Sequence, residues 1–211
     1  MNLGGAEGQY LMTPPTGQNA VINPSGAEIP SDGRSITIFV DGNAYIADNI
    51  TYRSNYSVDD IPRFALVARG NIYIGPGVTR LDGLYIAQPV NPTNISAINA
   101  DSGVIWTCHA NDNNPVLDTF PNDFCRQGLL VNGAFIAKQI NMLRIRGDVA
   151  AAPSPSSAGS EEQLESALSS NNIAEVFNYP PEMLVGGPFF SQPASTGDPR
   201  VQSLISLPPV F

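Results

Sequence analysis

The sequence contains very little lysine and little charge of either sign. Lys138 is the single lysine in 211 residues, and charged residues make up 14% of the chain, against roughly 25% in an average soluble domain. Acidic residues outnumber Lys and Arg by 19 to 10, so the formal net charge is −9. A nucleic-acid surface needs basic residues to meet phosphates, and anionic membranes attract the same residues. We therefore expect this segment to contact neither nucleic acid nor membrane.

Long apolar runs are also missing. No stretch reaches the roughly 18 apolar residues that indicate a transmembrane helix. The opening MNLGGAEGQYLMTPP lacks the basic and apolar blocks of a signal peptide. Two interpretations remain: a cytosolic protein, or an extracellular, cell-surface protein whose anchor or signal is not part of this chain.

Cysteine and histidine are scarce. Cys108 and Cys125 flank a polar loop rich in Asn and Asp, and His109 is the single histidine. A bridge across this loop would stabilise the fold by about 3 kcal/mol and would persist in an oxidising compartment. We predict a Cys108–Cys125 disulfide, which favours the extracellular interpretation; two reduced thiols are the alternative. A metal site is disfavoured because no CxxC pair occurs, and we expect His109 at the surface.

Turn-forming residues are abundant. The chain has 19 glycines and 19 prolines, yet 42% of it is hydrophobic, and apolar and polar residues alternate in segments such as RSITIFV. This pattern predicts an all-β fold with tight turns. We expect an irregular N-terminal segment (1–34), a β body (35–147) with the disulfide loop 108–125, a Pro/Ser linker with a short helix (148–170), and an extended strap packed on the body (171–211).

A short pattern recurs in the β body. The segments AYIADNI (44–50), IYIGPGV (72–78), LYIAQPV (84–90) and AFIAKQI (134–140) share an aromatic residue, then Ile, then a small residue and a closing aliphatic. This pattern predicts the strand–bend–strand unit of a parallel β-helix, whose coils stack and share one core. The alternative is an antiparallel β-sandwich in which the Gly-rich pieces are hairpin turns.

The alternation of side chains in a strand predicts which residues face the core. Residues on either side of the aromatic are aliphatic, so we expect Ile46, Ile74, Ile86 and Ile136 to line one interior axis. The aromatic residues would then point outward as a ladder formed by Tyr45, Tyr73, Tyr85 and Phe135. We expect the strap to cover them through Phe177, Phe189 and Phe190. The alternative is an exposed aromatic shelf that stacks on sugar rings.

A resemblance adds to this interpretation. The order of ARGNIYIGPGVTRLDGLYIA, a Cys-bounded loop, LLVNGAFIAKQINMLRIRG, a Ser/Pro linker, AEVFNYPPEMLV and SLPPVF resembles β-helical ectodomains of uncharacterised surface proteins from candidate-phyla bacteria. It spans roughly residues 36–211. The short GNIYIGPGV pieces are similar to the polymer-forming repeats of bactofilins. The first resemblance implies a location outside the cell and a structural or contact role, and neither supplies catalytic residues.

Residues for catalysis are not apparent. Asp59 and Asp60 are adjacent but precede Ile-Pro, which is typical of a turn. Asp112, Asp118 and Asp123 lie in the disulfide loop, where oxygen-rich loops attract calcium, but the spacing is not that of an EF-hand. We interpret this loop as a contact element and expect no cofactor or metal.

These features predict a non-enzymatic structural or adhesion module of a cell-surface or pilus-associated protein. Its partner would be a protein or glycan at a cell surface. The alternatives are a carbohydrate-binding or carbohydrate-degrading β-helix and a self-assembling bactofilin-like scaffold.

Overall fold

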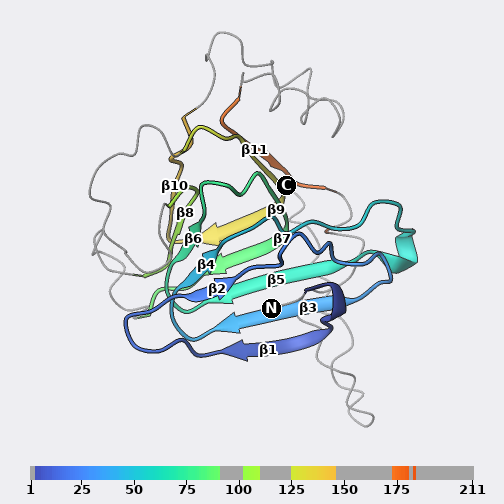
Figure 1. Cartoon of the computed structure of the whole chain (residues 1–211), viewed down its shortest axis with the longest axis horizontal. Helices are drawn as coiled ribbons and strands as arrows, with labels where there is room; N and C mark the ends of the chain where they lie inside the picture. The colour runs from blue at the N-terminus through green and yellow to red at the C-terminus, as the bar shows by residue number, and fades with distance from the viewer. Residues whose placement is uncertain (1–2, 91–101, 110–124, 146–172, 181–182, 184–211) are drawn as a thin grey trace, which may run out of the picture.

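Two parallel β-sheets enclose one apolar core in the computed structural model (Figure 1). The structure describes residues 3–90, 102–109, 125–145, 173–180 and 183. Sheet A has six strands in the order β1 (Gly8–Met12), β3 (Ser35–Val40), β5 (Arg63–Ala68), β7 (Arg80–Ala87), β9 (Leu129–Ala137) and β11 (Glu175–Asn178). Sheet B has five strands in the order β10 (Gln139–Asn141), β8 (Val104–Trp106), β6 (Ile72–Ile74), β4 (Ala44–Ile46) and β2 (Ala20–Ile22). Two short 3-10 helices are η1 (Leu3–Gly5) and η2 (Val58–Asp60).

Successive strands alternate between the two sheets. Every odd-numbered strand belongs to sheet A and every even-numbered strand to sheet B. All pairings between the described strands are parallel, and a parallel pair cannot be joined by a tight hairpin. The all-β prediction is therefore confirmed, and the antiparallel sandwich is wrong for the described part of the chain.

Inward side chains stack in columns across each sheet. Because the strands pair in register, residues at equivalent positions lie directly above one another. In sheet A one column consists of Tyr10, Ile38, Leu66, Tyr85 and Phe135. In sheet B the matching column consists of Ile22, Ile46 and Ile74. Both columns belong to the same core cluster, so each strand buries its apolar face against the opposite sheet.

The four aligned segments are two pairs on different sheets, which corrects the predicted inward face. The first two segments form β4 and β6, and there Ile46 and Ile74 are fully buried as predicted. The last two lie in β7 and β9, where the prediction of the inward face is wrong. Ile86 is half-buried and Ile136 is 52% exposed, whereas Tyr85 is fully buried. The same sequence pattern therefore presents its Ile side chains to the core in sheet B and its aromatic side chains to the core in sheet A.

The N-terminal segment is more regular than the sequence suggested. Residues 8–12 and 20–22, expected to be irregular, form β1 and β2, one in each sheet. Leu3, just before β1, is fully buried in the core. The Arg34 guanidinium holds this turn by donating hydrogen bonds to the carbonyls of Gly4 (2.9 Å) and Ala6 (3.3 Å).

In the C-terminal part of the chain, β11 lies within the predicted strap and pairs with β9. The linker and helix expected over 148–170 lie outside the described residues.

Candidate functional site

A cleft of about 440 Å³ lies against sheet A at the start of its strands. Its floor includes Asp82 of β7, Asn132 of β9 and Asn178 of β11, and its wall comes from the connection between β4 and β5. The chain neighbours Leu81 and Val131 belong to the core. Alternation along a strand therefore places Asp82 and Asn132 on the opposite, outer face of the sheet. This cleft is the candidate functional site.

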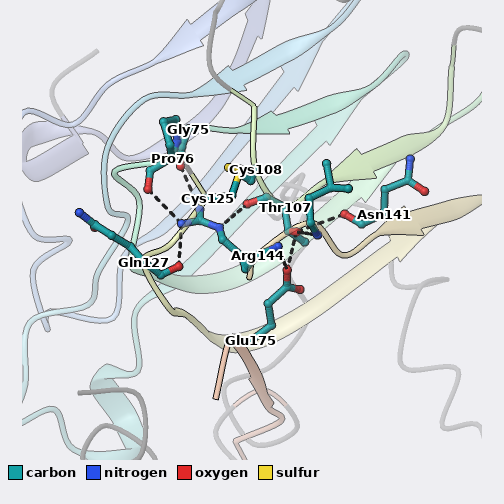
Figure 2. The surroundings of a disulfide bond; sticks show 10 residues. Gly75, Pro76, Thr107, Cys108, Cys125, Gln127, Asn141, Arg144 and Glu175 are labelled. Atoms are coloured by element: carbon teal, nitrogen blue, oxygen red, sulfur yellow. Dashed lines mark hydrogen bonds between the residues drawn. A yellow bond between two sulfur atoms is a disulfide. The ribbon is translucent and has the colours of Figure 1, made fainter. Parts of the chain in front are cut away.

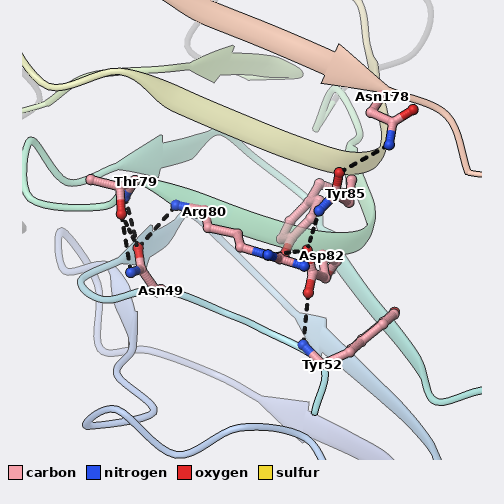
Figure 3. Close-up of polar contacts among 8 residues, drawn as sticks. Asn49, Tyr52, Thr79, Arg80, Asp82, Tyr85 and Asn178 are labelled. Carbon is pink, nitrogen blue, oxygen red and sulfur yellow. Dashed lines mark hydrogen bonds and ion pairs between the residues drawn. The ribbon is translucent and has the colours of Figure 1, made fainter. Parts of the chain in front are cut away.

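A polar ladder runs across the floor of the cleft (Figure 3). Asn178 donates from its amide nitrogen to Asn132 Oδ1 at 3.2 Å, and Asn132 donates to Asp82 Oδ1 at 3.0 Å. The three residues occupy equivalent positions on neighbouring strands, as the register requires. Hydrogen bonds between stacked side chains fix their rotamers, so the floor is preorganised rather than adaptable.

Asp82 is the carboxylate of this ladder and has 1% of its surface exposed. Its Oδ1 also accepts a bond from Arg80 Nε at 3.0 Å, and its Oδ2 accepts the Tyr52 backbone N–H at 2.7 Å. Burial raises the pKa of Asp82 above the usual aspartate value, and the Arg80 charge and the hydrogen bonds oppose that rise. The carboxylate is therefore held by three donors and has little contact with solvent.

Tyr52 builds the wall of the cleft by inserting its ring beside β5 and β7. The Tyr52 hydroxyl accepts the Phe64 backbone N–H at 2.8 Å, a donor that a strand residue would otherwise bind. Gly83 makes room for it: its φ is +116°, and a Cβ there would lie 2.5 Å from the Phe64 carbonyl oxygen and 3.0 Å from the Tyr52 hydroxyl. Burial raises the pKa of Tyr52 well above its usual value, so the hydroxyl stays protonated.

The start of β7 is fixed by a partly buried amide. Asn49 Oδ1 accepts the backbone N–H groups of Thr79 at 2.7 Å and Arg80 at 3.0 Å, as Figure 3 shows. Asn49 also donates to the Thr79 hydroxyl at 3.2 Å. The backbone of Arg80 is thus anchored, and its guanidinium side chain, 30% exposed, reaches the cleft.

Two arginines bring guanidinium groups to the inner cleft, and one of them, Arg80, is paired with Asp82 at 3.0 Å. Arg63, the first residue of β5, lines the cleft together with Arg80. The opposing inner charge is the single carboxylate of Asp82. Glu28 lies in the lining, but its side chain is 52% exposed and lies 3.9 Å from Arg53. Tyr56, Asn55 and Ser54 complete a rim of hydroxyl and amide groups.

The disulfide prediction is confirmed, because Cys108 and Cys125 are bonded with a Cα–Cα distance of 5.9 Å. Beside it lies Arg144, which is 6% exposed (Figure 2). Its guanidinium donates to the carbonyls of Thr107 (2.7 Å), Gly75 (2.9 Å), Pro76 (3.0 Å) and Gln127 (3.2 Å).

Burial lowers the pKa of Arg144 to about 10, and the charge of Glu175 raises it. The guanidinium is therefore cationic at neutral pH. One buried cation thus joins three separate segments of the chain, at Gly75-Pro76, Thr107 and Gln127, and this arrangement serves the fold rather than a ligand.

The predicted aromatic ladder is divided between the sheets. Tyr45 and Tyr73 pair in sheet B, and Tyr85 and Phe135 pair in sheet A. The outward orientation is wrong for Tyr85, which is fully buried in the core, and for Phe135, which packs against the same core at the paired position of β9. Phe177 of β11 meets Phe135 edge-on at 5.2 Å between ring centroids, whereas Phe189 and Phe190 lie outside the described residues.

The surface position predicted for His109 is wrong. It is 5% exposed, and its ring packs against Tyr73 in a tilted arrangement with a centroid distance of 4.5 Å. His109 follows Cys108 directly in the sequence, and its backbone N–H donates a hydrogen bond to the Ile74 carbonyl. Asp112, Asp118 and Asp123, the expected contact element, lie outside the described residues.

No group of three or more His, Cys, Asp or Glu side chains suited to a metal ion occurs in the described ranges. Within those same ranges, no helix is long and apolar enough to cross a membrane. No family model matches the chain, and no curated protein or solved structure shows significant similarity to it.

Sequence reasoning missed the cleft, although a signal for it was present. The aligned segments at 84–90 and 134–140 are preceded by Asp82-Gly83 and Asn132-Gly133. A polar residue at one position of two stacked strands predicts a polar ladder on the outer face. No sequence signal placed Tyr52 and Arg63 in the cleft, because their positions depend on how the β4–β5 connection packs against sheet A.

Proposed function

We propose that the chain is a parallel β-helix and acts as a rigid, non-enzymatic display module outside the cell. The observation that carries the fold is the strict alternation of successive strands between two parallel sheets. A chain that alternates in this way and always pairs with the strand two elements on is winding in one direction. Such a rod offers a stiff frame on which loops are held apart.

Hydrogen bonds at the corners support the winding. Where the chain leaves sheet A, the backbone N–H of Arg69 donates to the Val40 carbonyl, and the backbone N–H of Gln88 donates to the Ala68 carbonyl. Where the chain leaves sheet B, the backbone N–H of Gly75 donates to the Ile46 carbonyl. The parallel bridges Ile29↔Tyr52 and Ile50↔Leu81 add a third line of contact between the sheets. Coil therefore meets coil along the turns as well as along the strands.

The disulfide supports the extracellular location. It is consistent with an oxidising compartment, because glutathione and thioredoxin keep thiols reduced in the cytosol. Both cysteines are nearly fully buried, with 2% and 1% of their surface exposed, and the corner they close is also held by Arg144. The module would present the segment between Cys108 and Cys125 to a protein or glycan on another surface.

Adhesion is tested with beads that carry the folded chain. Beads coated with the purified chain should be retained on a panel of bacterial cells, whereas beads coated with serum albumin should wash away. Soluble chain added in excess should compete for the same cells. Equal retention of both kinds of bead would contradict the adhesion role.

A second function, carbohydrate binding, is favoured by the cleft on sheet A. Its lining combines two arginines with amide and hydroxyl groups, which are the groups that recognise sugar hydroxyls and acids.

A further inference from the structure

We propose that the cleft on sheet A binds a saccharide that carries a carboxylate, with Arg63 and Arg80 facing the acid group. This inference does not depend on the adhesion role, because it rests on the geometry and charge of the described lining residues. It deepens the carbohydrate-binding alternative by naming the site and the chemical class of the sugar.

The guanidinium groups that line the cleft indicate a ligand that carries a carboxylate. The protein carries a formal net charge of −9, yet Arg63 and Arg80 meet in the same concave surface. The Asp82 carboxylate is 1% exposed and accepts bonds from Arg80, Asn132 and the Tyr52 backbone. It offsets part of the Arg80 charge from beneath, while the Arg80 side chain stays 30% exposed and reaches the cleft. Guanidinium groups prefer carboxylates because their N–H donors match the two oxygens.

The remaining lining groups indicate a ligand that is rich in hydroxyls. Asn55, Asn178, Ser54 and Tyr56 bring amide and hydroxyl groups to the same cleft. These side chains both donate and accept hydrogen bonds, as sugar hydroxyls do. The volume of about 440 Å³ lies within the range of small-molecule sites.

Other ligand classes fit less well. A peptide that binds by strand addition pairs with a free sheet edge, whereas most of the cleft floor is the outer face of β7 and β9, which are paired on both sides; only β11, which contributes Asn178, is an edge strand. Nucleic acid is disfavoured by the acidity of the whole chain. An apolar ligand would remove water from the partly exposed guanidinium groups of Arg63 and Arg80 and would offer them no hydrogen-bond acceptor in exchange.

The floor of the cleft is already in place without a ligand. The Asn178–Asn132–Asp82 ladder is closed by hydrogen bonds of 3.2 and 3.0 Å, and Tyr52 is locked by Phe64 at 2.8 Å. A preorganised surface loses little side-chain entropy on binding. We therefore expect binding without a change in the sheet.

The test is calorimetric titration of the full chain with D-galacturonate and D-glucuronate. The matched neutral sugars D-galactose and D-glucose and the simple anions acetate and phosphate serve as competing probes. We expect one of the two uronates to bind at least about tenfold more tightly than its neutral partner, which is the effect of losing one charge-assisted hydrogen bond.

The variant R63Q should weaken uronate binding by about tenfold or more for the same reason. The control R69Q removes a charge of the same kind just beyond the other end of β5, where Arg69 pairs with Asp41 at 2.6 Å, and should leave binding unchanged. Thermal unfolding of both variants checks that each is folded. Y56F, which removes one hydroxyl from the rim, should weaken binding by a smaller factor.

Several outcomes would overturn the proposal. Equal affinity for galacturonate and galactose would exclude a role for the acid group. Acetate or phosphate binding as tightly as a uronate would exclude the saccharide. An equal loss in R63Q and R69Q would place the site elsewhere, and an absence of heat with every probe at millimolar concentration would exclude the cleft as such a site.

Discussion

Gly133 in β9 lies directly opposite Gly83 in β7, and the two backbones approach so closely that a Cβ on Gly133 would overlap the Gly83 carbonyl oxygen. This contact lies at the level where Tyr52 inserts beside β5. Two stacked glycines therefore allow the sheet to accommodate a side chain from the neighbouring connection.

The variant G133A is expected to be strongly destabilised, because its methyl group must displace backbone rather than a flexible side chain. We expect a loss of about 3 kcal/mol or more in the free energy of unfolding. The control is G77A, since a Cβ at Gly77 meets nothing within 4 Å. Urea unfolding of both variants measures the difference, and equal stability would contradict the close approach.

Replacing the buried Arg144 is expected to lower the free energy of unfolding strongly. In R144M four carbonyl oxygens lose a shared cationic donor, and we expect a loss of about 3–5 kcal/mol. The control R126M alters an exposed arginine and should change stability by no more than about 0.5 kcal/mol. Chemical denaturation under non-reducing conditions gives both values. A loss in R144M as small as that in R126M would show that the four hydrogen bonds do not stabilise the fold.

Breaking the disulfide should lower stability by about 3 kcal/mol, since the bond closes a loop with a sequence separation of 17 and restricts the unfolded chain. The variant C108S/C125S should unfold at lower urea concentration than the parent. The parent without reductant should contain no thiol that reacts after denaturation. Two reactive thiols in the freshly purified, denatured parent would contradict the bond.

Asp82 should make stability decrease as pH rises. Its pKa is raised in the folded state, mainly by burial, so the native state binds this proton more tightly than the unfolded state does. Its contribution is fully present below the unfolded value of 3.8 and is lost as pH rises through the folded pKa. Arg80 donates to the carboxylate from its guanidinium Nε and Tyr52 from its backbone N–H, and burial raises the pKa of the Tyr52 hydroxyl.

The variant D82N isolates that contribution, because it cannot titrate at this position. Unfolding free energies of the parent and D82N are measured at steps of pH from acid to neutral. The difference between them should shift in favour of D82N as pH rises through the window. A difference that stays constant, or that shifts in favour of the parent, would contradict the raised pKa.

Much of the fold could be predicted from the sequence, for physical reasons. The alternation in RSITIFV and the aromatic–Ile pattern indicated strands with one apolar face, and β3, β4 and β6 follow that pattern. The inward face of β7 could not be predicted from the same pattern. The burial of Tyr85 and the exposure of Ile136 depend on which sheet a segment joins, and that depends on the corners rather than on the strand itself.

A different alignment comes closer to the structural repeat. Gly42, Gly70 and Gly103 each lie just before a strand of sheet B, and these strands carry Tyr45, Tyr73 and Trp106 at their outer positions. The alignment on Tyr-Ile concealed this repeat for two reasons. Trp106 is not followed by Ile, so β8 was left out, and β7 of sheet A also contains a Tyr-Ile pair, so it was included. The cleft was harder to predict, since its wall comes from the position of Tyr52, which is set by the Gly83 contact.

The central claim is that the chain winds around one core, and methyl NOE spectroscopy on the Ile-, Leu- and Val-labelled chain tests it most directly. The account predicts cross-peaks that connect Ile22 to Ile46 and Ile46 to Ile74 across sheet B, and Ile38 to Leu66 across sheet A. It also predicts no cross-peak between Ile46 and Ile136, which lies on the outer face of sheet A. Contacts from Ile46 to Ile136, without those to Ile22 and Ile74, would contradict the winding and the function proposed from it.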